Sequence, residues 1–137
     1  MEAPYLLPLG SKPAFWWKWI FPTPELNRHP DAHKLVGLGV SPGKVTAVAR
    51  VIHSLDEMQP LNDGEILVTR TTTPAWTPLF ARIVGLVTDL GGPLAHGSIV
   101  AREYGIPAVM GTGSATQRIR DGEIITVDGT AGRVVLN

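Results

Sequence analysis

The sequence of 137 residues has no cysteine, no net charge and no long uninterrupted hydrophobic run. Without cysteine, disulfide bonds and thiolate metal sites are excluded; a cytoplasmic location is compatible with that and is the one we expect. The 12 basic side chains balance the 12 acidic ones, so charge gives no reason to expect nucleic acid or an anionic membrane as a partner. The length fits one domain plus an extension.

Residues 1–34 differ in composition from the rest, and we interpret them as a Pro- and Trp-rich N-terminal extension or linker before a domain at 35–137. Prolines forbid a long helix or a regular strand there. Residues 15–21 hold three of the four tryptophans, but the run is too short to cross a bilayer and Lys18 interrupts it. Three interpretations stay open, in order of preference: an apolar strap on the domain, a docking surface for a partner, and a contact with a membrane interface.

One stretch combines a buried strand, a glycine-rich turn and a helix. Residues 83–88 are apolar between polar flanks, which predicts a strand, and Gly91, Gly92 and Pro93 end it with a sharp turn. The apolar spacing that follows predicts a helix over 96–104, ended by residues 105–107. A histidine, His96, therefore stands where the turn passes into the helix.

That position has a chemical consequence. The first backbone N–H groups of a helix lack intrahelical partners and carry partial positive charge, so they suit a phosphate and disfavour a protonated imidazole. A neutral His96 can attack a phosphoryl group, with Gly97 leaving room for it and the Ser98 hydroxyl donating to it. The alternative is that His96 is only a polar helix start, which is the commoner interpretation of an isolated histidine.

Residues 91–109 (GGPLAHGSIVAREYGIPAV) closely resemble the phosphohistidine signature of the phosphoenolpyruvate (PEP)-utilising enzymes, such as PEP synthase, pyruvate phosphate dikinase, rifampicin phosphotransferase and enzyme I. The glycine pair, the histidine four residues after it and the Ala-Arg-Glu-x-Gly-Ile-Pro-Ala-Val run all match, and the similarity extends over about 36–136. Leu94 and Ala95 stand where dikinases and synthases usually have Thr-Cys or Thr-Ser. In this respect the chain is more similar to the rifampicin phosphotransferase branch.

The resemblance implies an α/β fold, the three-layer β/β/α swivelling phosphohistidine domain, which agrees with helices alternating with strands in mid-chain. It also implies a phosphoryl carrier that takes phosphate on His96 from a donor site to an acceptor site. The implied partners are an ATP-grasp-type nucleotide-binding domain or subunit and a PEP/pyruvate- or acceptor-binding domain or subunit. Mg²⁺ and ATP or PEP are expected at those partners, and this domain itself is expected to bind no metal or cofactor and to be an incomplete enzyme alone.

Two other functions are alternatives to the carrier. The first is a non-catalytic interaction domain of the same fold that docks a partner through its Trp-rich segment. The second is a hydrolytic or metal enzyme using the four histidines, which ranks last because only His96 stands in a motif.

The rest of the chain predicts short elements. We expect strands at about 65–69, 84–88, 108–110, 123–127 and 133–136, short helices at 77–82 and 114–119, and a hairpin or bulged strand pair within 36–52. Arg70 and Thr72 follow the strand at 65–69, and loops after parallel strands meet at one sheet edge, so both are candidate phosphate-binding residues beside His96. Ordinary surface and turn roles are the alternative for both.

Two further charged side chains are ambiguous. For Arg102, next to Glu103, we favour a structural ion pair over a phosphate contact. Asp89 either orients His96 or serves as a turn residue.

Overall fold

The computed structural model describes residues 33–57 and 61–136, so the expectations for the Trp-rich segment lie outside the described residues. The strands are β1 (Lys34–Val36), β2 (Leu38–Ser41), β3 (Lys44–Val51), β4 (Ile66–Thr69), β5 (Gly85–Thr88), β6 (Ala108–Met110), β7 (Ile124–Asp128) and β8 (Arg133–Leu136). The helices are α2 (Thr77–Phe80), α3 (His96–Tyr104) and α4 (Ala115–Arg118), with 3₁₀ turns η2 (Leu55–Glu57) and η3 (Pro74–Trp76). The predicted strands and the helix over 96–104 are confirmed; the two short helices are shorter than predicted.

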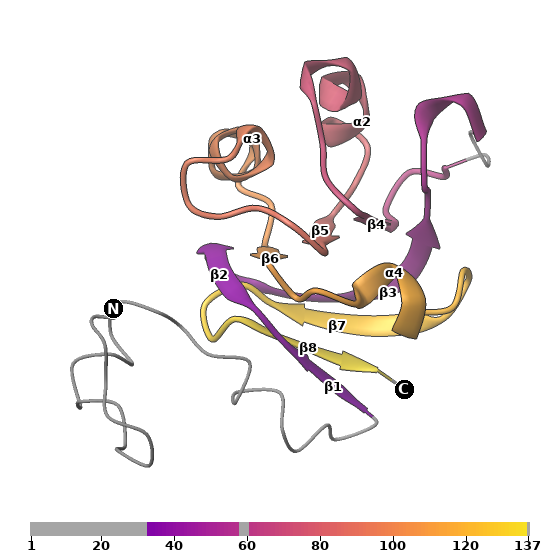
Figure 1. The fold of residues 1–137 in the computed structure, drawn as a ribbon, viewed down its shortest axis with the longest axis vertical. Helices are drawn as coiled ribbons and strands as arrows, with labels where there is room; N and C mark the ends of the chain where they lie inside the picture. Colours follow the sequence, from indigo (N-terminus) through magenta and orange to yellow (C-terminus); the bar gives the residue numbers. More distant parts are fainter. Residues whose placement is uncertain (1–32, 58–60, 137) are drawn as a thin grey trace, which may run out of the picture.

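The eight strands form one mixed sheet in the order β1-β8-β7-β3-β4-β5-β6-β2. Strands β3 to β6 pair in parallel, whereas β1, β8, β7 and the first half of β3 pair antiparallel. Figure 1 shows α2 and α3 on one side of β4, β5 and β6, and β7 and β8 on the other. The domain thus has a β/β/α layering, and the predicted α/β fold class is confirmed.

Two hydrophobic cores separate the three layers, and the alternation of side chains along the central strands explains them. In β4, Leu67 packs into the core under the helices, while Ile66 and Val68 pack into the core between the two strand layers. In β6, Ala108 and Met110 join the first core and Val109 joins the second. A strand between two apolar layers must be apolar on both faces, and all four residues of β4 are buried.

The chain joins the antiparallel and the parallel halves of the sheet at two places, within β3 and between β1 and β2. The first half of β3 pairs with β7, and Ala49–Val51 then pairs with β4. Strands β1 and β2 follow each other with only Gly37 between them, yet β1 pairs with β8 and β2 pairs with β6. The predicted hairpin within 36–52 is therefore wrong: β2 carries a bulge between Gly39 and Ser41, but its partner is β6 and not β3.

The crossing from β1 to β2 depends on glycines, because two backbones come into direct contact there. A Cβ on Gly39 would lie 2.1 Å from the carbonyl oxygen of Gly129, and one on Gly129 would lie 1.8 Å from that of Ser41. The Gly37 N–H donates to the Gly132 carbonyl at 2.9 Å. Side chains at these positions would keep the turn between β7 and β8 away from β2.

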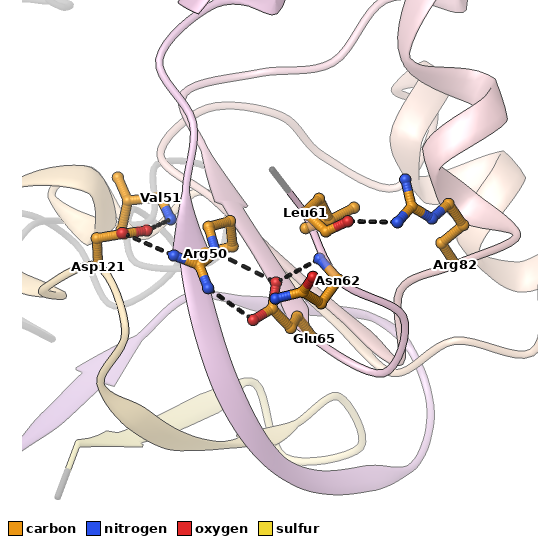
Figure 2. A network of polar contacts seen from close by, with 7 residues as sticks. All are labelled: Arg50, Val51, Leu61, Asn62, Glu65, Arg82 and Asp121. Carbon is orange, nitrogen blue, oxygen red and sulfur yellow. Dashed lines mark hydrogen bonds and ion pairs between the residues drawn. The ribbon is translucent and has the colours of Figure 1, made fainter. Parts of the chain in front are cut away.

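An ion-pair network joins the start of β4 to neighbouring segments (Figure 2). Arg50 on β3 bonds both carboxylate oxygens of Glu65, at 3.2 and 2.7 Å, and contacts Asp121 at 2.9 Å. Glu65 also accepts the backbone N–H of Asn62. The Arg50 bond lowers the pKa of the buried Glu65 carboxyl below its ordinary 4.5, against the opposing effect of burial. The same bond raises the pKa of Arg50.

Candidate functional site

The loops that follow β4 and β5 lie side by side at one edge of the sheet. The Leu90 N–H, after β5, donates to the Arg70 carbonyl, after β4, at 3.0 Å. This is the arrangement expected for parallel neighbours, whose carboxyl ends meet at the same edge. It brings the loop containing Thr72 beside the loop that leads to His96.

His96 is the first residue of α3. Ala95, in extended conformation, is the N-cap and supplies no side-chain cap, but its carbonyl accepts the N–H groups of Ser98 and Ile99 at 3.0 and 3.2 Å. At the other end Gly105 adopts the left-handed conformation, with φ 69°, which ends the helix as the sequence predicts. The N-terminal dipole of this nine-residue helix therefore points at the histidine.

The half-buried imidazole of His96 lies between two threonine hydroxyls. Thr72 Oγ1 is 3.4 Å from Nδ1, and Thr77 Oγ1 is 3.2 Å from Nε2. The ring of Phe80 meets the imidazole edge to face, with centroids 6.2 Å apart and planes at 86°. Thr72 is buried and Thr77 half-buried, so Nδ1 faces inward and Nε2 faces the more accessible side.

Thr77 and Phe80 were not predicted as site residues. Both lie on α2, which packs beside α3, and only that packing brings them to His96. The available signal was the Thr-Pro pair that starts a helix one loop before His96, but it predicts a helix start and not a contact.

Gly97 and Ser98 face the interior of the domain. A Cβ on Gly97 would lie 2.6 Å from Thr72 Oγ1 and 2.7 Å from Met110 Cε, so glycine lets the helix approach β6 and Thr72. The Ser98 hydroxyl is fully buried and donates to the Gly92 carbonyl at 2.6 Å, with Met110 Sδ at 3.0 Å. Its hydrogen thus stabilises the glycine loop, and a phosphate contact through Ser98 remains a prediction that would require this bond to break.

Arg70 is exposed at the same edge, and its guanidinium makes no hydrogen bond or ion pair with another described residue.

Arg102 does not form the predicted ion pair. Its guanidinium donates to the carbonyls of Val40, at 2.9 Å, and Pro93, at 2.7 Å. Asp89 accepts the N–H and hydroxyl of Thr116, at 2.9 and 2.6 Å, so it anchors α4 and does not orient His96.

Within residues 33–57 and 61–136, no group of three or more histidine and carboxylate side chains is placed to hold a metal ion. No helix in that same part of the chain has the length and apolarity needed to span a bilayer. The site around His96 consists of hydroxyls, backbone amides and one aromatic edge, and Arg70 follows β4 at the same edge of the sheet. Such a set can bind an anion and present a nucleophilic nitrogen to it.

Comparison with known proteins agrees with these features. The family model described as "PEP-utilising enzyme, mobile domain" matches residues 61–132, which include His96, Thr72 and Thr77. The chain is 52% identical over 103 residues to a rifampicin phosphotransferase of Bacillus cereus, covering 75% of this chain and 12% of that protein. It is 52% identical over 101 residues to a probable phosphoenolpyruvate synthase of Staphylothermus marinus, covering 72% of this chain and 12% of that protein.

Among solved structures, a solution structure of an Enzyme I protein superposes with a TM-score of 0.51 at 35% identity, over 56% of this chain and 32% of the other. The chain spans between 3% and 13% of the length of the first curated relatives that it matches. The similarity therefore concerns one domain of much longer proteins.

Proposed function

Because this chain belongs to the family of the PEP-utilising enzyme mobile domain, we propose that it carries a phosphoryl group on His96 between a donor site and an acceptor site on other domains or subunits. The observation that carries the proposal is the placement of His96 at the first position of α3, with a hydroxyl beside each ring nitrogen. A histidine with only a structural role has no need of a helix terminus and a glycine neighbour.

The geometry supports attack by Nε2. In this proposal Nδ1 carries the ring proton and its N–H donates a hydrogen bond to the buried Thr72 hydroxyl, 3.4 Å away, which leaves the lone pair on Nε2. This lone pair attacks the phosphorus, the N–P bond forms, and the bond from phosphorus to the leaving oxygen breaks with its electron pair remaining on that oxygen. No proton has to leave the ring during this step. In the second transfer an acceptor oxygen attacks the phosphorus and the N–P bond breaks, which restores the imidazole.

Three groups stabilise the phosphoryl group on Nε2. The Thr77 hydroxyl, 3.2 Å from Nε2, donates to a phosphoryl oxygen once the nitrogen is occupied. The backbone N–H groups at the start of α3 and the helix dipole favour the added negative charge. Arg70, exposed at the same edge, neutralises charge on the donor or on the transferred group.

We expect the phosphoryl donor to bind to another domain or subunit. ATP or PEP with Mg²⁺ is expected at the partner domains, as the resemblance to the PEP-utilising enzymes implies. The relatives that this chain matches are much longer, since the 103 matched residues cover only 12% of the Bacillus cereus enzyme.

The test is site-specific labelling of the full chain. Potassium phosphoramidate phosphorylates histidine without a partner protein, and we expect one rapid, acid-labile and base-stable phosphate on His96, located by mass spectrometry. His96→Ala should lose the rapid phase, because no other described histidine stands at a helix start between hydroxyls. His53→Ala, which removes an exposed histidine elsewhere, should keep it. A rapid phase that survives in His96→Ala, or an acid-stable label on Ser98 or Thr72, would contradict the carrier function.

A further inference from the structure

We propose that Thr69, the last residue of β4, is a positioning residue that determines which ring nitrogen of His96 carries the proton. In the reactive arrangement of the site, the Thr69 hydroxyl accepts the hydrogen of the Thr72 hydroxyl, and Thr72 in turn accepts the N–H of Nδ1. This inference rests on the proposed function and deepens it, because it concerns the tautomer that has its lone pair on Nε2.

The side chain of Thr69 faces the layer of α2 and α3 (Figure 1). Side chains alternate along a strand, and Leu67, two residues earlier, packs into the core under these helices. Thr69 is fully buried and pairs in register with Thr88 of β5, the strand that leads to the loop before His96. Thr72 follows Thr69 three positions later, in the loop at the same edge of the sheet.

Among the residues that the structure describes, Thr69 Oγ1 is the buried side-chain oxygen or nitrogen that has no hydrogen-bond partner. A buried hydroxyl without a partner destabilises the folded state, so its presence at this edge calls for a role in another arrangement of the site. The other buried or half-buried threonine hydroxyls at this edge are bonded to His96 (Thr72, Thr77), to backbone carbonyls (Thr88, Thr112) or to a carboxylate (Thr116).

The hydrogen of the Thr72 hydroxyl decides the tautomer of His96. Among the described residues, the Thr72 side chain has one hydrogen-bond partner, Nδ1 of His96, at 3.4 Å. If Thr72 donates its hydrogen to Nδ1, the proton of the neutral ring is on Nε2, which then donates to Thr77 and has no lone pair for phosphorus. If another group accepts the Thr72 hydrogen, Thr72 accepts Nδ1–H and the lone pair is on Nε2.

Thr69 supplies that other acceptor. Its oxygen has unused lone pairs, is shielded from solvent and lies at the end of the strand from which the Thr72 loop leaves. In the structure the two hydroxyls are not bonded to each other, so the bond belongs to a second arrangement in equilibrium with this one. The rate at which His96 attacks is then proportional to the population of that arrangement.

Thr69→Val removes the hydroxyl and keeps the shape of the side chain. In the full chain labelled with ¹⁵N-histidine, the nitrogen shifts of His96 give the fraction of each tautomer at a pH where the ring is neutral, and their loss in His96→Ala assigns them. We expect Thr69→Val to lower the Nδ1–H fraction and to slow phosphoramidate labelling by about three- to tenfold, the factor that one hydrogen bond provides. Thr69→Ser, which restores a hydroxyl, should restore both quantities.

A double-mutant cycle tests whether Thr69 acts through Thr72. Thr72→Val alone should slow labelling, and Thr69→Val in that background should have no further effect, because the hydrogen that Thr69 accepts is gone. Thr126→Val is the matched control: its hydroxyl pairs with Thr46 at 2.7 Å in the antiparallel half of the sheet, and its removal should change neither tautomer nor rate. In urea denaturation Thr69→Val should be at least as stable as wild type, because the lost hydroxyl has no partner among the described residues.

Three outcomes would overturn the role of Thr69. Equal labelling rates and tautomer fractions in wild type and Thr69→Val would show that its hydroxyl does not act on His96. Additive losses in the double variant would mean that Thr69 acts without Thr72, and a Thr69→Val protein less stable than wild type would assign the hydroxyl a structural role. Failure of phosphoramidate to label His96 in the wild type would instead contradict the carrier function.

Discussion

Gly97 allows Thr72 and Met110 to lie close to the start of α3, next to His96. Gly97→Ala would add helix propensity worth about 1 kcal/mol. However, the new Cβ would lie 2.6 Å from Thr72 Oγ1 and 2.7 Å from Met110 Cε, and overpacking of this kind costs about 1–3 kcal/mol. We therefore expect a net loss of up to about 2 kcal/mol in the free energy of unfolding. Labelling of His96 should also slow, since Thr72 has to move.

Chemical denaturation and phosphoramidate labelling measure the two effects of Gly97→Ala. Gly92→Ala is the matched control, because a Cβ there meets nothing within 4 Å, and its stability should stay within about 0.5 kcal/mol of wild type. A Gly97→Ala protein as stable and as reactive as wild type would show that Thr72 does not position the imidazole.

The sequence predicts some residues of the site and gives no signal for others. His96 and Gly97 stand in a contiguous signature, and the placement of Thr72 follows from the rule that loops after parallel strands share an edge. The contact of Thr77 with His96 spans 19 residues and depends on how a four-residue helix packs against α3. No local pattern encodes such packing, and this is why Thr77 and Phe80 were missed.

At the scale of elements, Arg102 links three segments: it extends from α3 to the carbonyls of Pro93, in the glycine loop, and Val40, in β2. Arg102→Met keeps much of the apolar stem and removes both bonds, so we expect a loss of about 1–3 kcal/mol in the free energy of unfolding. Arg102→Lys should recover part of this stability, because an ammonium lacks the planar fork with which the Arg102 guanidinium donates to both carbonyls.

If Arg102 had only a structural role, Arg102→Met would lower the stability and leave the labelling of His96 unchanged. We also expect slower labelling of His96 by phosphoramidate at a temperature where the variant is fully folded, since the loop before the histidine loses an anchor. Arg133→Met, an exposed arginine on β8, serves as the control and should change neither quantity. Unaltered labelling in a destabilised Arg102→Met protein would exclude the positioning role.

Elements defined by a long local pattern were predicted well, as the helix over 96–104 shows, because glycine turns bound it on both sides. The partner of a strand was not predictable in the same way. Residues 36–52 show the alternation of two strands joined by a tight turn, and Val45, Ala47 and Val51, on one face of β3, pack against the core between the two strand layers. The partners of β1 and β2 depend on the crossing at Gly37, which takes β1 to β8 and β2 to β6, and these partners lie far away in the sequence.

At the scale of the whole molecule, the Arg50–Glu65 pair couples stability to pH. The folded-state pKa of Glu65 is below its ordinary 4.5, so its ionised form stabilises the fold above that value. The stabilisation is lost as pH falls below about 4.5 and through the folded pKa, because the unfolded chain then binds the proton more readily. The free energy of unfolding should therefore decrease in this acidic range.

Glu65→Gln tests this coupling. At neutral pH the variant should lose about 1.5–3 kcal/mol, the usual value of hydrogen bonds to a charged group. Urea denaturation at a series of pH values should show a smaller decrease below about pH 4.5 than in wild type. Asp63→Asn is the control, since Asp63 forms its ion pair with Arg82 at an exposed position, where screening leaves little to lose. An unchanged acid profile in Glu65→Gln would assign the pH dependence to other carboxylates.

The pairing of β1 with β8 has a mechanical consequence. Lys34 lies opposite Val135 and Val36 opposite Arg133. The N-terminal end of β1 and the C-terminal end of β8 therefore lie side by side at the same end of the ladder (Figure 1). A pulling force on these two ends loads the hydrogen bonds one after another, as in opening a zipper, and does not shear them all at once. Tension would thus be released by peeling β1 away from β8, while the parallel strands beneath His96, in the other half of the sheet, keep their register.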